Sequence, residues 1–163
     1  MNRYKNYLIK IILISAVFIF LISIWACGKK VLNVSLIGGK RLNGENAVVV
    51  RIYQLKSADK FQLATKESFW KGKDSDIELL NNELILNYRQ ELILRPNEER
   101  RFPIEIEPDT KFIGVAADFN KPDKNKWRYF IPITKFKGKA VVVVLGEDSL
   151  IITDINSVNL LNR

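Results

Sequence analysis

Beyond residue 30, apolar and polar side chains alternate with the two-residue period of β-strands. In the clearest case, residues 102–106, one phenylalanine and two isoleucines share a face opposite Pro103 and Glu105. Pro103 has no N–H to donate to a neighbouring strand, so this strand is expected at the edge of a sheet. Further strands are expected at residues 31–37, 47–55, 91–95, 111–119, 127–133, 139–145 and 149–153.

Glycine, proline and asparagine pairs separate these runs and mark turns, including Gly38-Gly39, Asn43-Gly44, Pro96-Asn97, Pro108-Asp109, Pro122-Asp123 and Lys137-Gly138. About eight short strands at this spacing predict one mainly β domain, a two-sheet β-sandwich. The last two strands, separated by residues 146–148, are expected to pair as a hairpin.

Residues 57–87 depart from this pattern, because their apolar positions are spaced for helices rather than strands. Ser57 and Asp59 are predicted to cap a first short helix, and Asp74 or Ser75 a second. We therefore expect a small helical insertion that crosses one end of the sandwich.

The start of the chain is different in kind. Residues 11–26 (IILISAVFIFLISIWA) carry no charge, and only basic charges precede them. This pattern is typical of a secretory signal peptide, since a membrane-spanning helix needs about 20 apolar residues. The segment Ile24-Trp25-Ala26-Cys27 resembles a bacterial lipobox, although Trp25 is unusual there. We predict a signal peptide at residues 1–26 and lipid attachment at Cys27, the chain's one cysteine.

The lipid expected on Cys27 is a covalent diacylglycerol with an additional N-acyl chain. Two or more chains make anchoring stable, because each buried methylene contributes about 0.8 kcal/mol. Gly28 in place of an aspartate resembles the pattern of lipoproteins sorted to the outer membrane. The alternative is an uncleaved signal anchor. On the lipoprotein interpretation, residues 27–30 are lipid anchor and linker, 31–154 the sandwich and 155–163 a polar tail.

Charge limits the classes of partner. The chain has 26 basic and 18 acidic residues, and the signal peptide removes three basic ones, which leaves 23 − 18 = +5 on the mature chain. These charges are interspersed, and no dense basic run is present. Nucleic acid is therefore not an expected partner.

Catalytic chemistry is sparse. The chain has no histidine, so the usual general base and the commonest metal ligand are missing. No nucleophile-elbow, Walker-type or dinucleotide-binding motif is present. Asp118, near a strand end, is the best candidate acid, but such an aspartate more often caps a turn. We expect no catalytic residues, no metal and no bound cofactor, and therefore no enzyme.

Four strings carry a family resemblance in their order and spacing: VVVRIYQLK at 48–56, LILRPNE at 92–98, FIGVAADF at 112–119 and Trp127-Arg128. Together they resemble the outer-membrane lipoprotein of the bacterial type VI secretion system, the TssJ family, over residues 31–153. The resemblance implies a transthyretin-like two-sheet sandwich with a small helical insertion. It also implies a lipid-anchored protein that faces the periplasm.

The resemblance implies a structural role as well. Such a lipoprotein binds the periplasmic C-terminal domain of a large inner-membrane subunit and tethers the trans-envelope assembly to the outer membrane. In the family, the loop between the first two strands is implicated in that binding. Here it corresponds to residues 38–46, with Lys40, Arg41, Asn43 and Glu45 as possible contacts. The alternative for this segment is an ordinary solvated hairpin.

Most of the matching strings also have a packing explanation. Arg51 is expected to pair with an acid across the sheet, and Tyr53 to pack between the sheets. Gly114 and Ala116 are expected to be small because a large side chain such as Trp127 covers them.

A different function on the same fold stays open at this point. A lipid-anchored carrier of a small ligand would need a pocket lined by several aromatics. The candidates for such a lining are Phe61, Phe69, Trp70 and Tyr88.

Overall fold

A computed structural model describes residues 30–136 and 140–154 of the chain. Its elements are β1 (Lys30–Gly38), β2 (Val48–Leu55), α2 (Asp59–Leu63), α3 (Lys66–Phe69), α4 (Ser75–Leu80), η1 (Asn81–Glu83), β3 (Leu84–Leu94), β4 (Glu99–Ile106), β5 (Phe112–Ala117), β6 (Arg128–Pro132), η2 (Ile133–Lys135), β7 (Val141–Leu145) and β8 (Leu150–Asp154). The predicted signal peptide (1–26), Cys27 and the tail (155–163) lie outside the described residues. Within the described part, no helix is both long and apolar enough to span a bilayer.

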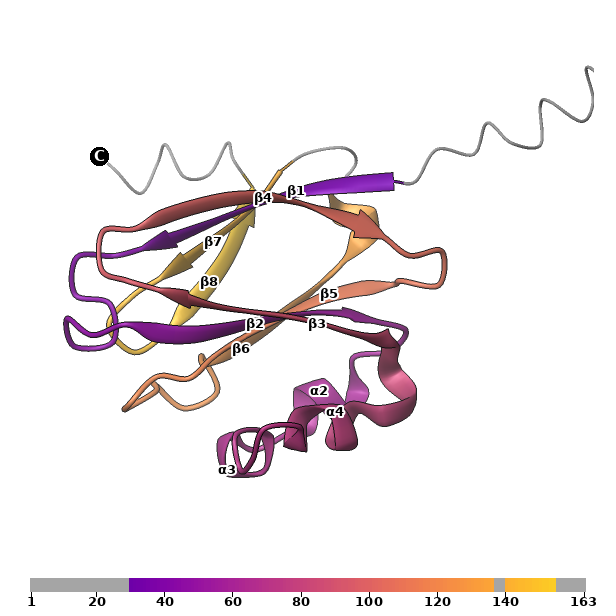
Figure 1. Cartoon of the computed structure of the whole chain (residues 1–163), viewed down its shortest axis with the longest axis horizontal. Coiled ribbons are helices and arrows are strands. Elements are labelled where there is room, and N and C mark those ends of the chain that lie inside the picture. The colour runs from indigo at the N-terminus through magenta and orange to yellow at the C-terminus, as the bar shows by residue number, and fades with distance from the viewer. Residues whose placement is uncertain (1–29, 137–139, 155–163) are drawn as a thin grey trace, which may run out of the picture.

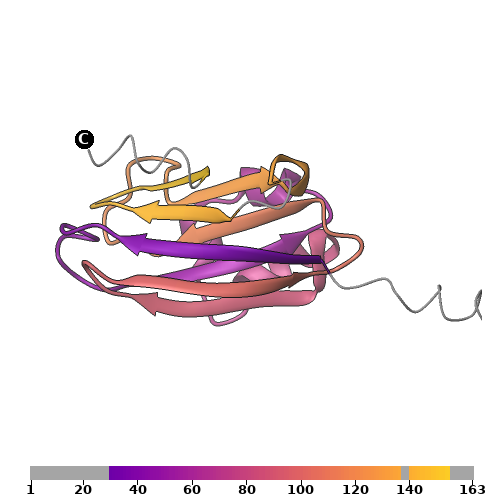
Figure 2. The ribbon, with the colours of Figure 1, turned by 90° about the horizontal axis from the view of Figure 1, so that it is seen from above.

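The strands form two four-stranded sheets that face each other, ordered β4-β1-β7-β8 and β3-β2-β5-β6 (Figure 1). Seen from above, β1 and β4 lie side by side, with β7 and β8 beyond them (Figure 2). The predicted β-sandwich is confirmed. The edge position inferred from Pro103 is also confirmed, since β4 is the outermost strand of its sheet. β7 and β8 form the expected antiparallel hairpin, whereas β1 and β7 are parallel.

The main core lies between the two sheets. Leu32, Val34 and Leu36 of β1 point inward and are buried, whereas Val31 is half exposed on the outer face. Burying an aliphatic side chain of this size contributes about 1.5–3 kcal/mol relative to leaving it exposed. The alternation in the sequence therefore sets which face of β1 meets the opposite sheet.

A second core lies on the outer face of the β3-β2-β5-β6 sheet, where α2, α3 and α4 cover it (Figure 1). The prediction that the insertion crosses one end of the sandwich was therefore wrong. Tyr53 was also misplaced, because it contacts Phe61 and Phe69 of the helices with ring centroids 5.7 Å apart. β2 is buried on both faces, so a period-two pattern cannot tell its two sides apart.

The insertion ends earlier than predicted. β3 begins at Leu84, which pairs with Leu55 of β2, so residues 84–87 are strand rather than helix. Two of their apolar residues, Leu84 and Ile85, are buried in the structure. A short apolar run of this kind fits either helix or strand in the sequence.

The predicted helix caps were only partly correct. The N-cap of α2 is Ala58. The Ser57 hydroxyl accepts the Asp59 N–H at 3.3 Å and donates to the Asp59 carboxylate at 2.7 Å. The Glu83 carboxylate instead accepts the Lys60 N–H at 2.9 Å, so the free donors of this helix start are satisfied from a distant segment. Asp74 does occupy the N-cap position of α4, but without a capping hydrogen bond from its side chain.

No side chain fits at position 114, because Phe61 and Leu55 pack directly against Gly114. A Cβ at this position would lie 3.1 Å from Phe61 Cζ and 3.0 Å from Leu55 Cδ1. The large residue over this glycine is therefore Phe61 of α2, not Trp127 as the sequence suggested.

Candidate functional site

Four connections gather at one end of the sandwich, and we call this surface the loop end. They are residues 39–47, 95–98, 118–127 and 146–149. Backbone hydrogen bonds hold them together: Gly39 N–H donates to Leu145 O at 2.8 Å, and Asp123 N–H donates to Asp148 O at 2.9 Å. The loop end is therefore one continuous, ordered surface on the left of Figure 1.

The predicted partner loop lies here, but it is not a hairpin. It carries the chain from β1 in one sheet to β2 in the other. Leu42 is fully buried, and Asn43 is only 4% exposed. The Asn43 side chain donates to Ala47 O at 2.9 Å and accepts the Asn120 N–H at 2.7 Å. Asn43 therefore fixes the loop from inside, while Lys40, Arg41 and Glu45 are exposed.

The tip of this loop has an unusual backbone. Asn43, Gly44 and Glu45 all have positive φ, at 48°, 65° and 65°. A left-handed glutamate is uncommon, and such conformations cost about 1–3 kcal/mol each where they are sparsely populated. Hydrogen bonds from the neighbouring connections hold the loop in this shape. A loop fixed in advance loses little conformational entropy when it binds a partner.

The exposed charges of the loop end are of mixed sign. Arg41 contacts Glu147 of the β7–β8 turn at 2.9 Å, and both side chains are well exposed, so this pair contributes at most about 1 kcal/mol. A hollow of about 410 Å³ lies beside it, lined by Asn43, Gly44, Asn46, Asn120, Lys121, Glu147 and Asp148. This polar lining suits hydrogen bonding to a protein segment.

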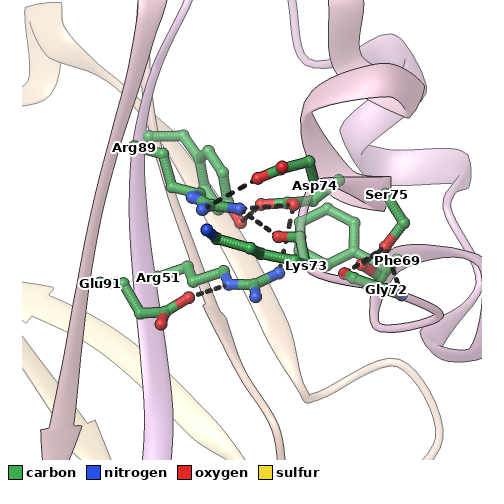
Figure 3. A network of polar contacts seen from close by, with 10 residues as sticks. Arg51, Phe69, Gly72, Lys73, Asp74, Ser75, Arg89 and Glu91 are labelled. Carbon is green, nitrogen blue, oxygen red and sulfur yellow. Dashed lines mark hydrogen bonds and ion pairs between the residues drawn. The ribbon is translucent and has the colours of Figure 1, made fainter.

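A buried ionic network ties the insertion to the sheet (Figure 3). Its centre is Asp76 of α4, which is completely buried. The Tyr53 hydroxyl donates to Asp76 at 2.5 Å, and Arg89 donates to it at 3.0 Å. Arg51 Nη1 lies 3.2 Å from the same carboxylate as an ion pair without hydrogen-bond geometry. One buried acid is thus shared by three side chains of β2 and β3.

The surroundings of Arg51 and Tyr53 raise the pKa of both side chains, so both stay protonated. Arg51 donates to Glu91 at 2.6 Å, the predicted pair across the sheet, and its guanidinium lies 4.2 Å from the centre of the Trp70 ring. Burial opposes the charge of Arg51, but the hydrogen bond that Arg51 donates to Glu91 and the charge of Asp76 raise its pKa. Burial and the Asp76 contact raise the pKa of Tyr53 far above its ordinary value. The arrangement is structural rather than acid–base chemistry.

The remaining sequence candidates take structural places. Asp118 follows β5, donates its N–H to Val49 O at 2.9 Å and pairs with Lys66 at 3.2 Å. Phe61 and Phe69 are fully buried against each other, with centroids 5.8 Å apart, so they fill the second core instead of lining a pocket. The side chain of Tyr88 is outside the described part. Across the described residues, no group of histidine, cysteine or acidic side chains is placed to hold a metal ion.

Sequence reasoning missed Asp76 and Arg89 completely. Both sit among polar neighbours in the sequence, and nothing in their spacing distinguishes them from solvated residues. Only the fold identifies these residues, because the pairing of β2 with β3 places Arg51 and Arg89 on the sheet face that Asp76 contacts.

Comparison with known families gives a match over most of the domain. A family described as "Type VI secretion lipoprotein, VasD, EvfM, TssJ, VC_A0113" matches residues 30–148. No curated protein sequence matches the chain.

Solved structures of type VI secretion components have the same fold. The T6SS lipoprotein TssJ1 from Pseudomonas aeruginosa superposes with a TM-score of 0.68 and 22% identity, over 78% of this chain and 97% of that one. A chain of a type VI membrane complex gives 0.67 and 25%, over 77% and 99%. A chain in a structure of the T6SS protein TssM C-terminal domain from EAEC gives 0.65 and 23%, over 76% and 98%.

Proposed function

This chain belongs to the type VI secretion lipoprotein family, and from that membership we propose that it tethers a trans-envelope secretion complex to the outer membrane. The partner is the periplasmic C-terminal domain of the large inner-membrane subunit. The observation that carries the proposal is the family match over residues 30–148, on a sandwich whose loops gather at one end. Similar chains in structures of a type VI membrane complex and of the TssM C-terminal domain support the choice of partner.

The geometry of β1 supports this role. Two residues separate Cys27 from Lys30, where β1 starts, so the lipid and the start of the domain lie within about 10 Å. β1 has nine residues and runs about 30 Å to Gly38, at the loop end. A lipid on Cys27 therefore places the loop end on the side of the domain far from the anchor, where a partner from the opposite membrane can reach it.

The chemistry of the described residues supports a scaffold rather than an enzyme. The buried Asp76 and the groups that contact it hold the insertion on the sheet. We propose that the protein has no catalytic activity and no metal or dissociable cofactor, and that the acyl chains on Cys27 are its one non-protein group. Gly28 supports sorting to the outer membrane, with the domain in the periplasm.

Replacing Cys27 by serine is expected to abolish incorporation of labelled fatty acid and to release the protein from the membrane fraction. The physical reason is that serine offers no thiol for diacylglycerol transfer, and the anchoring energy of the acyl chains is lost. Metabolic labelling followed by membrane fractionation measures both effects. Continued labelling of the Cys27→Ser protein would rule out the lipoprotein assignment.

Reversing two charges in the loop, Lys40→Asp with Arg41→Asp, is expected to weaken binding of the periplasmic partner domain about tenfold. Both side chains are exposed at the loop end, where charge changes alter association. The matched control is Lys111→Asp with Lys135→Asp, which makes the same charge change on exposed lysines at the opposite end of the sandwich. Equal affinities for the loop variant and the wild-type protein would remove the loop from the interface.

A further inference from the structure

A groove runs from the loop end along the helical insertion to the edge strand β6. Its larger hollow, about 680 Å³, is lined mainly by the α2–α3 connection and the β5–β6 loop. A second hollow of about 410 Å³ continues it and shares Gln62, Asn125 and Arg128. Asn120 joins the larger hollow to the loop end. The three hollows therefore form one continuous surface.

The groove carries an excess of unpaired positive charge. Lys124 and Arg128 line the two hollows, and Lys121 lines the adjoining hollow of the loop end. None of these three side chains forms an ion pair with a described residue. Lys66, which also lines it, is neutralised by Asp118 at 3.2 Å. Glu67 is the one acid in the described lining of the two hollows. The loop-end hollow that holds Lys121 also holds Glu147, which pairs with Arg41, and Asp148. The charges of this groove therefore favour an acidic partner.

Arg128 is held in a fixed position in the groove. Its guanidinium lies 4.5 Å from the centre of the Trp127 ring, and Trp127 itself is buried. Nη2 donates to the backbone oxygen of Gln62, whereas Nη1 is buried without a hydrogen-bond partner in the described structure. Burial lowers the pKa of Arg128, and no acid offsets it. A planar guanidinium fixed in this way is well suited to a carboxylate.

Apolar side chains lie beside this cation. Leu63 of α2 is 81% exposed, and Tyr129 of β6 is 45% exposed. Two large apolar side chains exposed beside a desolvated arginine are typical of the centre of an interface, where aromatic and arginine residues dominate.

We propose that this groove binds an acidic segment of the inner-membrane partner, with one carboxylate on Arg128 and an apolar side chain against Leu63 or Tyr129. The inference rests on the proposed function, since the segment belongs to the same partner. It gives the Trp127-Arg128 pair a direct role: Trp127 belongs to the core and positions Arg128 for contact.

The test measures the affinity of the full-length protein, in detergent micelles, for the periplasmic C-terminal domain by surface plasmon resonance at several salt concentrations. The groove variants are Arg128→Gln and the double change Lys121→Glu with Lys124→Asp. The control, Lys71→Glu with Lys73→Asp, changes the same number of charges on exposed lysines outside the groove. Each groove variant is expected to bind about tenfold more weakly, with a shallower salt dependence, while the control binds as the wild-type protein does.

Three results would overturn the inference. If the wild-type protein binds and both groove variants bind equally well, the groove is not part of the interface, although the proposed function stands. If the control weakens binding as much as the lysine variant, net charge alone explains the effect. Absence of binding by the folded wild-type protein would remove the proposed function together with the groove. Because Lys121 and Lys124 are exposed, their variant stays informative if Arg128→Gln disturbs folding.

Discussion

Replacing Asp76 by asparagine is expected to lower the free energy of unfolding by about 3–5 kcal/mol, because it removes the one buried carboxylate shared by two arginines. Arg51 and Arg89 would keep their charges at 8% and 15% side-chain exposure, and they would lose their common partner. The Tyr53 hydroxyl would also lose a charged acceptor. Urea unfolding followed by tryptophan fluorescence measures the change, since Trp127 is buried and Trp70 packs over Arg51.

Asp109→Asn provides the matched control for this experiment. Asp109 is exposed in the turn between β4 and β5, so the same substitution there should change stability by no more than about 0.5 kcal/mol. If Asp76→Asn were equally harmless, apolar contacts alone would hold the insertion on the sheet, and the network would have no role in stability.

Replacing Phe69 by alanine is expected to cost about 3–5 kcal/mol, the range for removing a fully buried aromatic side chain. Phe69 lies at the centre of the second core, where its ring contacts four other aromatic rings. Its ring centroid lies 5.7 Å from those of Tyr53 and Trp70, 5.8 Å from Phe61 and 5.2 Å from Trp127. These edge-to-face contacts stabilise the fold beyond the contribution from the apolar area that the ring buries. Thermal and urea unfolding of the purified variant measures the loss.

Leu63→Ala is the control for Phe69→Ala, because Leu63 lies on the same insertion but is 81% exposed. Its effect on stability should be within about 0.5 kcal/mol. A loss below about 1 kcal/mol for Phe69→Ala would mean that the insertion and the sheet unfold separately. The helices of the insertion would then not form one cooperative core with the sandwich.

Features set by local chemistry could be predicted from the sequence. Pro103 indicated that β4 is an edge strand, because the missing N–H can be read from the residue itself. The alternation of apolar and polar residues in β1 likewise indicated which side of that strand faces the core. The pairing of Arg51 with Glu91 was expected across a sheet, and the register of β2 and β3 places them directly opposite. The loop between β1 and β2 was located by the resemblance, but its hairpin alternative was wrong because the two strands belong to different sheets.

Features that depend on distant segments could not be predicted. The start of α2 is capped by Glu83, which is 23 residues from Lys60 and signals nothing in a local pattern. In the sequence, Asp76 cannot be distinguished from a solvated residue of a short helix. Its role depends on the fold, in which Arg51 of β2 and Arg89 of β3 contact it. Asn43 looked like an exposed contact, yet its hydrogen bond to Asn120 crosses 77 residues. The lipid on Cys27 lies outside the described residues and stays a prediction.

The tethering role is tested most directly by calorimetric titration of the full-length, lipidated protein, in detergent micelles, with the periplasmic C-terminal domain of the large inner-membrane subunit from the same genome. The account predicts saturable one-to-one binding with a Kd in the micromolar range or tighter, about −8 kcal/mol or more favourable. Absence of saturable binding by a folded chain would contradict the tethering role and leave a lipid-anchored sandwich whose partner lies elsewhere.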